Sequence, residues 1–557
     1  MHNTISRPTQ PVDKELSKPS ALEMALFSRV IVIATFALVT CLVGYHLGAD
    51  VNWDLLNYHF YNGYLYTHGK LFSDSLATVQ SYLDPLLNSF YYFLISALSP
   101  LAVNMILATM QSFALSAVFF FSTYVISDFT TRRPLLISTL LTLSALIGPV
   151  FWSEIGGTMG DTLLATPVIV GIFLLTRYVT TAARGTERPA DLAVAGLLIG
   201  FVSGLKFTQM TYALAAFLSL ALILGTQRQL APRKTAVAMA IFSIAMVCAF
   251  GSTYANIGWL LWRHFHNPIF PYFNNIFHSP YMAPHAWRDK RWIPTSFLEA
   301  TKIPFSAFIF GTQRAGGMEI HFRNSLFALI FILLIPYAWR AHTIRRSASP
   351  EDLGRAFFIT FFLIAFIVWA LVFGYYRYLA VLELLAPLAL FTLLCSVRPA
   401  RYTSLAPTAI AAFVFAAALS NLPEPNWGRE PFRASYFGLN RSTFRKYQHC
   451  LLIVGQQPMG FILPYFPDNT RIIGIPENIG FTRRFLKTDL APIYKFHGPV
   501  YYLVRYKKSF RASLAGAPTL APYHLRSTDH CTKIQTRIFS VALCKVEHIN
   551  AFPSRRT

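Results

Sequence analysis

The stretch Trp53-Asp54-Leu55-Leu56-Asn57-Tyr58-His59 follows the first long apolar run of the chain, which spans about 27–47. A run of about 20 apolar residues is long enough to cross a bilayer as a helix. The stretch therefore lies where the chain leaves the membrane on the far side. An aspartate beside a histidine in this aromatic setting suits a proton-transfer site at the boundary between water and lipid.

The composition extends this interpretation to the whole chain. Of its 557 residues, 54% are hydrophobic and 13% are charged, whereas a soluble domain carries about 25% charged residues. The mean hydropathy is +0.43. The net charge of +23 indicates cytoplasmic loops and lipid headgroup contacts rather than nucleic acid. We therefore expect an all-α polytopic membrane protein.

The apolar runs predict about eleven transmembrane helices. They lie at about 27–47, 101–126, 134–152, 162–179, 191–205, 208–224, 235–262, 322–338, 356–374, 379–395 and 403–420. Because Lys and Arg favour cytoplasmic loops, the basic N-terminal tail, 1–26, is predicted to be cytoplasmic. The transmembrane domain then covers 27–420, with outside loops at 48–100 and 263–321.

One shorter apolar run, at about 85–98, is predicted to lie in the membrane interface as a helix. A full span there would place Arg132 and Arg133 outside, against the positive-inside rule.

After residue 420 no apolar run is long enough to span a bilayer, so 421–557 is predicted to be a small soluble domain outside the cytoplasm. The segments 450–455, 471–475 and 500–504 have the pattern of buried strands, and 459–466 that of a short helix. Strands alternating with helices predict an α/β domain. Cys531 and Cys544 flank a strand-like run, and the sequence leaves open whether they form a disulfide.

Six ionisable residues lie at the predicted outside ends of different segments: Asp54, Asp84, Glu154, Asp161, Lys206 and Arg377. Such residues near membrane depth are costly and point to function. Structural alternatives are open for each group. The aspartates could cap helices, and Glu154 could be solvated. His59 could sit in the interface, and the two cations could reach headgroups.

Soluble-enzyme motifs are absent from the sequence. It contains no Walker A loop, no dinucleotide fingerprint and no His-Glu-x-x-His zinc motif, and its six cysteines form no metal-ligand pattern. No cofactor is predicted, and the sequence does not support a divalent metal. The energy for any chemistry must arrive stored in a lipid-linked substrate.

This layout resembles the GT-C superfamily of integral-membrane glycosyltransferases, in which an acidic residue follows the first span, as Asp54 does here. It is similar to the branch of lipid A aminoarabinose transferases and protein O-mannosyltransferases at three further motifs. These are Asp84-Pro85-Leu86-Leu87, Gly160-Asp161-Thr162-Leu163, and Arg377-Tyr378-Leu379 with Pro387. The family often pairs two acids after the first span, whereas Leu55 follows Asp54, which counts against a metal site. The stretch Asn267-Pro268-Ile269-Phe270-Pro271-Tyr272-Phe273-Asn274 resembles uncharacterised bacterial members.

The resemblance implies transfer of a sugar, with inversion, from a polyprenyl-phosphate donor to a lipid, glycan or protein acceptor outside the cytoplasm. Asp54 would be the general base. Substrate-binding roles would fall to His59, Asp84, Asp161, Lys206, Arg377 and Tyr378, with the cations holding the leaving phosphate. The implied location is a plasma membrane, here a bacterial inner membrane. The rival classes are a transporter or flippase, a surface-polysaccharide ligase or polymerase, and a non-catalytic assembly protein.

Overall fold

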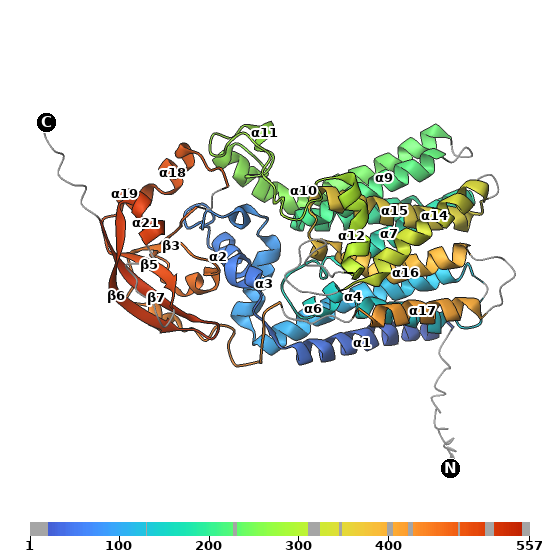
Figure 1. Cartoon of the computed structure of the whole chain (residues 1–557), viewed down its shortest axis with the longest axis horizontal. Coiled ribbons are helices and arrows are strands. Elements are labelled where there is room, and N and C mark those ends of the chain that lie inside the picture. The colour runs from blue at the N-terminus through green and yellow to red at the C-terminus, as the bar shows by residue number, and fades with distance from the viewer. Residues whose placement is uncertain are drawn as a thin grey trace, which may run out of the picture.

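The computed structural model describes residues 21–129, 131–226, 231–309, 323–344, 348–397, 405–421, 427–476, 479–506 and 517–548. The molecule is elongated, with a helical bundle at one end and a β-sheet at the other (Figure 1). Most of the predicted N-terminal tail (1–20) and one part of the second outside loop (310–322) lie outside the described residues.

Helices are found at every one of the predicted spans. They are α1 (Ala21–Leu47), α4 (Pro100–Ile126), α5 (Pro134–Leu146), α6 (Pro149–Glu154), α7 (Ala165–Ala183), α8 (Pro189–Leu205), α9 (Met210–Thr226), α10 (Pro232–Phe265), α14 (Ser325–Ile344), α15 (Pro350–Val372), α16 (Ala380–Val397) and α17 (Ala406–Leu419). Several begin at a proline, whose missing N–H group needs no partner in the first helical turn.

The prediction of one continuous helix at 134–152 is wrong, because α5 and α6 are separate. Gly148 and Pro149 lie at the break, and Glu383 of α16 supports the new helix start. Its Oε1 accepts hydrogen bonds from the backbone N–H groups of Val150 (2.8 Å) and Phe151 (3.1 Å). This carboxylate therefore caps the N-terminus of α6, although it belongs to another helix.

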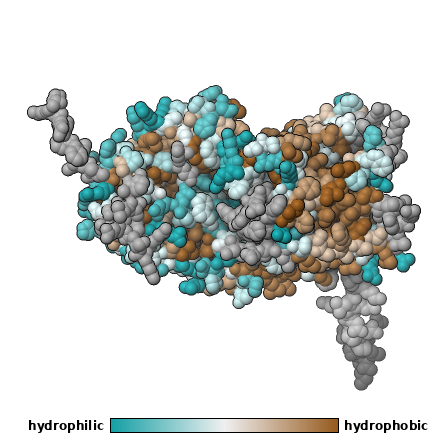
Figure 2. Space-filling view, viewed as in Figure 1, coloured by the Kyte–Doolittle hydropathy of each residue, from teal (hydrophilic) through white to brown (hydrophobic). Residues whose placement is uncertain are grey.

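Eight helices of the described chain are long and apolar enough to cross a membrane, while α5, α8 and α17 are shorter. Large apolar side chains such as Leu38, Ile244 and Trp339 are exposed on the outside of the bundle. Figure 2 shows this apolar surface over the bundle and a more polar surface over the other end. An apolar exterior on long helices is stable in lipid, so the protein is a multi-pass membrane protein.

The segment after α1 is largely helical rather than a loop. A π-helical segment, η1 (Leu55–His59), continues into α2 (Phe60–Thr67), and α3 (Leu86–Ala97) occupies the range predicted for the interfacial helix. These elements lie between the bundle and the sheet (Figure 1). The second outside loop contains α11 (Asn274–Phe277) and α12 (Phe297–Ile309). Its Phe265 and Phe270 rings stack at 4.0 Å and are buried.

The C-terminal region contains the predicted strands in a five-stranded mixed sheet. These are β3 (Leu451–Val454), β4 (Arg471–Gly474), β5 (Val500–Arg505), β6 (Leu525–Gln535) and β7 (Ser540–His548), in the order β4-β3-β5-β7-β6. Strand β3 is parallel to both β4 and β5, and β7 is antiparallel to β5 and β6. The predicted short helix is a 3₁₀ segment, η6 (Gly460–Tyr465). Cys531 and Cys544 are directly opposite in the β6–β7 pair and form a disulfide.

Several contacts fix the C-terminal region against the segment after α1. Strand β1 (Ala49–Asp50) pairs with β2 (Arg429–Glu430) in a separate two-stranded sheet. Gly460 packs so closely on η1 that an added Cβ would lie 2.0 Å from the carbonyl oxygen of Asn57. The carboxylate of Asp74 lies 3.4 Å from Lys70 and 3.6 Å from Arg471 of β4. These contacts hold the C-terminal region against the segment that follows Asp54.

Candidate active site

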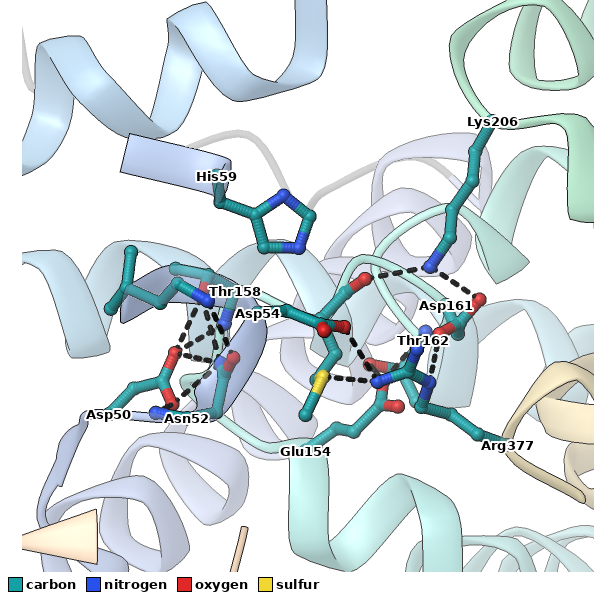
Figure 3. Close-up of polar contacts among 12 residues, drawn as sticks. Asp50, Asn52, Asp54, His59, Glu154, Thr158, Asp161, Thr162, Lys206 and Arg377 are labelled. Carbon is teal, nitrogen blue, oxygen red and sulfur yellow. Dashed lines mark hydrogen bonds and ion pairs between the residues drawn. The ribbon is translucent and has the colours of Figure 1, made fainter. Parts of the chain in front are cut away.

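Four of the predicted site residues form one ion-pair cluster at the end of the bundle that faces the sheet (Figure 3). Arg377 Nη1 lies 2.9 Å from Asp54 Oδ2, and Arg377 Nε lies 3.2 Å from Asp161 Oδ2. Lys206 Nζ lies 2.7 Å from Asp161 Oδ1. Asp161 thus bridges the two cations, and the cluster brings together four groups from separate segments of the chain.

Each member of this cluster is placed by the end of a helix. Asp54 immediately precedes η1, Asp161 precedes α7 and Lys206 follows α8. Arg377 lies in η4 (Tyr376–Leu379), which leads into α16. In the most apolar stretch of the span that includes α16, 83% of the residues are buried, against 17% in that of α1. Arg377 is therefore presented by a central helix of the bundle.

The segment that carries Asp161 is held by Gln111 of α4. Gln111 Nε2 donates to the Glu154 carbonyl (3.0 Å) and to Thr162 Oγ1 (2.9 Å), and its Oε1 accepts from the Gly156 N–H group (2.7 Å). Gly160 has a φ of +87°, and an added Cβ would lie 3.2 Å from the hydroxyl of Tyr91. This left-handed turn favours glycine and directs Asp161 toward the cations.

Tyr378 adds an aromatic face to the same cations. Its ring centre lies 5.7 Å from Lys206 Nζ and 5.4 Å from Arg377 Cζ, within the range of a cation–π interaction. The hydroxyl of Tyr212 donates to the Tyr378 carbonyl at 2.6 Å, which fixes the backbone next to Arg377.

Burial decides the charge states in the cluster. The side chain of Asp161 is 0% exposed, and those of Asp54 and Arg377 are each 13% exposed. Burial by itself would raise the pKa of Asp54, but Arg377, and less strongly Lys206, favour the charged carboxylate and hold its pKa below the usual value. Asp54 is therefore ionised at neutral pH and able to accept a proton.

Glu154 lies beside the cluster and behaves differently. Burial, and then repulsion from Asp161, raises its pKa to about 8, so the carboxyl group is mainly protonated at pH 7. Its Oε2 accepts from Thr162 N (3.2 Å) and Oγ1 (3.0 Å), while Oε1 has no hydrogen-bond partner among the described residues. The sequence left open whether Glu154 has a functional role or is solvated. Solvation is wrong, because the side chain is buried.

His59 is buried one helical turn after Asp54. Its Nδ1 lies 2.6 Å from Asn88 Oδ1, an acceptor, which assigns the ring proton to Nδ1. Burial lowers the pKa of His59 to about 4, so the ring is neutral at pH 7. Nε2 then carries a lone pair and has no hydrogen-bond partner within the described chain.

Asp84 does not join the ion-pair cluster. Its Oδ1 accepts from the Leu86 N–H group at 2.8 Å and so caps the start of α3. It forms no ion pair within the described residues, and burial raises its pKa to about 7. The structure thus shows the capping role that the sequence left open, and a role for Asp84 in substrate binding stays a prediction.

A second buried network positions Asp54. Asn52 Nδ2 donates to both carboxylate oxygens of Asp50 (2.9 and 2.8 Å), and Asn52 Oδ1 accepts from the Leu55 N–H group (2.8 Å). Asp50 Oδ2 also accepts from the N–H and hydroxyl groups of Thr158, both at 2.7 Å. Asn52 is therefore the helix cap, and the alternative that Asp54 only caps the helix is wrong because its side chain makes no capping bond.

The sequence did not predict this network or the role of Arg429, which holds the neighbouring segment before Asp161. Arg429 Nη2 donates to the carbonyl groups of Ser153 (2.7 Å) and Ile155 (2.9 Å). Asp50 and Asn52 flank Asp54 in sequence, a signal that could have found them. Arg429 lies far along the chain and follows no local pattern. In the described part of the chain, no group of three or more His, Cys, Asp or Glu residues is arranged to hold a metal ion.

The chain was compared with protein families, curated sequences and solved structures. No protein-family model and no curated protein sequence matches the chain. A solved structure that is similar in its overall arrangement is that of ArnT from Cupriavidus metallidurans bound to undecaprenyl phosphate. The TM-score is 0.48 and the sequence identity is 11%, over 93% of this chain and 98% of that chain.

Proposed function

We propose that this protein is a membrane glycosyltransferase that moves a sugar from a polyprenyl-phosphate donor to an acceptor outside the cytoplasm. One observation carries the proposal: two partly buried cations, Arg377 and Lys206, share the acid Asp161 beside an ionised Asp54. The paired cations suit a phosphate group, because a guanidinium binds two phosphate oxygens at once and an ammonium adds a point charge. Asp54, which is ionised and pairs with Arg377 alone among the described residues, suits a general base.

The proposed reaction is one displacement. The acceptor hydroxyl attacks the anomeric carbon and gives its proton to Asp54, while the bond from that carbon to the phosphate oxygen breaks. The electron pair leaves with the polyprenyl phosphate, and Arg377 and Lys206 stabilise the charge that develops. Attack opposite the phosphate inverts the anomeric centre. His59 and Tyr378 would orient the sugar.

The ion pair between Asp54 and Arg377 links donor binding to proton transfer. A donor phosphate competes with Asp54 for the same guanidinium group. When the phosphate binds Arg377, the main attraction that lowers the pKa of Asp54 weakens. The pKa of Asp54 then rises, and the carboxylate becomes a stronger base when the donor is in place. Asp161 keeps both cations together during this exchange.

The same proposal includes the location and domain limits: a bacterial inner membrane, with a cytoplasmic tail (1–26), a transmembrane domain (27–420) and an outside domain (421–557). The positive-inside pattern supports this orientation.

The test uses purified protein in lipid nanodiscs, supplied with polyprenyl-phosphate sugars carrying a radiolabelled sugar. Membranes from cells that lack the protein provide the acceptor, and both label transfer and free polyprenyl phosphate are measured. We expect transfer by the wild type and a loss of about 10²–10⁴-fold in Asp54→Asn, the usual contribution of a general base.

Asp191→Asn is the matched control. Asp191 is also buried and pairs with an arginine, Arg177, at 2.6 Å, but it lies at the opposite end of α8 from Lys206. This variant should keep its activity. Transfer from diphosphate-linked donors alone would instead identify a polysaccharide ligase, and no transfer from any donor would refute the proposal.

A further inference from the structure

A cavity lies at the sheet, and none of the ion-pair cluster residues lines it. Its volume is about 430 Å³, within the range of roughly 300–1,000 Å³ that is usual for small-molecule sites. The first outside segment contributes Leu76 and Thr78 to its wall, and the C-terminal region contributes the rest, among them Gln456, Gln457, Thr519 and Tyr523. The cavity is thus built where two parts of the chain meet, a preferred place for ligands.

The topology of the sheet explains why a crevice forms there. From β3 the chain crosses to β4 on one side, and then to β5 on the other side of β3. All three strands are parallel. In such sheets, ligands bind outside the carboxyl ends of the strands where the strand order reverses. Val454 ends β3, Gly455 to Gln457 follow it, and Ile475 follows β4, so the cavity opens at this position.

Close packing holds the first outside segment against the sheet at the cavity edge. The Gly474 N–H group donates to the Ser75 carbonyl at 3.1 Å. An added Cβ at Gly474 would lie 2.0 Å from the carbonyl oxygen of Leu76, so no other residue fits at this position. The cavity wall is therefore held by contacts between backbone segments.

The chemistry of the wall selects a neutral, hydroxyl-rich ligand. The described wall residues carry no charged side chain, which disfavours phosphates and carboxylates. Gln456 Oε1 accepts from the Arg505 N–H group at 3.0 Å, which leaves its amide N–H groups to donate to a ligand. Tyr523 adds a ring on which the C–H face of a sugar can stack. Amides, hydroxyls and one aromatic ring together suit a pyranose.

The cavity is joined to the candidate active site through η1. Asn57 lies three residues after Asp54 on that segment, and its Nδ2 lies 3.5 Å from Oε1 of the wall residue Gln457. A ligand held in the cavity would therefore be positioned relative to the proposed base.

We propose that this cavity binds a neutral sugar unit of the acceptor. The inference that the bound sugar belongs to the acceptor rests on the proposed glycosyl transfer. The inference that the cavity binds a sugar does not rest on it. The site holds a sugar unit of the acceptor that is separate from the reacting hydroxyl. It therefore selects acceptors that carry a neutral sugar in addition to the one that reacts.

The experiment measures saturation-transfer NMR on the full-length protein in nanodiscs. The probes are the methyl glycosides of glucose, galactose, mannose and N-acetylglucosamine. We expect at least one probe to bind the wild type, and binding to weaken about tenfold, or about 1.4 kcal/mol, in Tyr523→Ala. Thr519→Phe, which fills the cavity, should also weaken binding, and it serves as the test if Tyr523→Ala folds poorly.

The matched control is Tyr494→Ala. The Tyr494 ring lies 6.4 Å from Tyr523 but does not line the cavity, so this variant repeats the loss of ring packing and should keep sugar binding. Asp54→Asn should also bind the probe as the wild type does.

Either of two results would overturn the inference: no saturation transfer from any of the four probes, or equal transfer in the wild type, Tyr523→Ala and Thr519→Phe. Sugar binding without transferase activity would refute the proposed function but leave the sugar site. Activity without sugar binding would refute only the sugar site.

Discussion

Replacing Asp161 by asparagine tests whether this acid holds the two cations together. At an effective dielectric constant of about 20, its ion pairs are worth about 6 kcal/mol with Lys206 at 2.7 Å and about 5 kcal/mol with Arg377 at 3.2 Å, before desolvation. Desolvation offsets much of this gain. Removing one partner of a buried pair costs about 3–5 kcal/mol, and we expect a loss near the lower limit because Arg377 keeps its pair with Asp54.

Glu154, which lies beside Asp161, allows a second test of the role of Asp161. Asp161 contributes to the raised pKa of Glu154, so Glu154 should ionise more readily in Asp161→Asn and replace part of the lost charge. Glu154→Gln alone should raise the free energy of unfolding at pH 7, because glutamine resembles the protonated acid and no proton has to be taken up on folding. The double variant should be less stable, by about 1 kcal/mol or more, than the sum of the two single effects predicts.

The assay is the free energy of unfolding in mixed detergent micelles, followed by tryptophan fluorescence at pH 7, for the wild type and the three variants. Asp191→Asn again serves as the control for a buried acid paired with arginine. Two results would refute the reasoning. One is an Asp161→Asn variant as stable as the wild type, and the other is a double variant whose stability equals the sum of the two single effects within about 0.5 kcal/mol.

Three further predictions address pH, the second network and the disulfide. Between pH 4.5 and 8 the unfolded chain releases the Glu154 proton while the folded protein keeps it, so stability should fall with rising pH by up to about 1.4 kcal/mol per unit. Glu154→Gln should remove this slope, as measured by unfolding at pH 6, 7 and 8. Asn52→Ala removes the η1 cap and two bonds to Asp50, and should cost about 2–3 kcal/mol and lower the initial transfer rate. Replacing Cys531 and Cys544 together by serine should lower the stability of the sheet by about 2–4 kcal/mol, seen as faster cleavage by protease.

The elements of the fold could be predicted because their signals are local. The length of an apolar run sets the length of a helix in lipid, and this placed helices at all the predicted spans within a few residues. Buried strands such as β3 also have a local apolar signature. The break between α5 and α6 escaped prediction because a carboxylate from α16, Glu383, supports it.

The candidate site divides in the same way. Ionisable residues at the ends of apolar runs identified Asp54, Asp161, Lys206 and Arg377, since charge near lipid is rare and costly. Which acid pairs with which cation, and which carboxyl stays protonated, depend on distance and burial in three dimensions. The sequence by itself therefore determined the elements and the candidates. Only the tertiary structure decided the bridging role of Asp161, the protonation of Glu154, and the cavity between Leu76 and the carboxyl ends of the strands, because each depends on contacts between segments far apart in the chain.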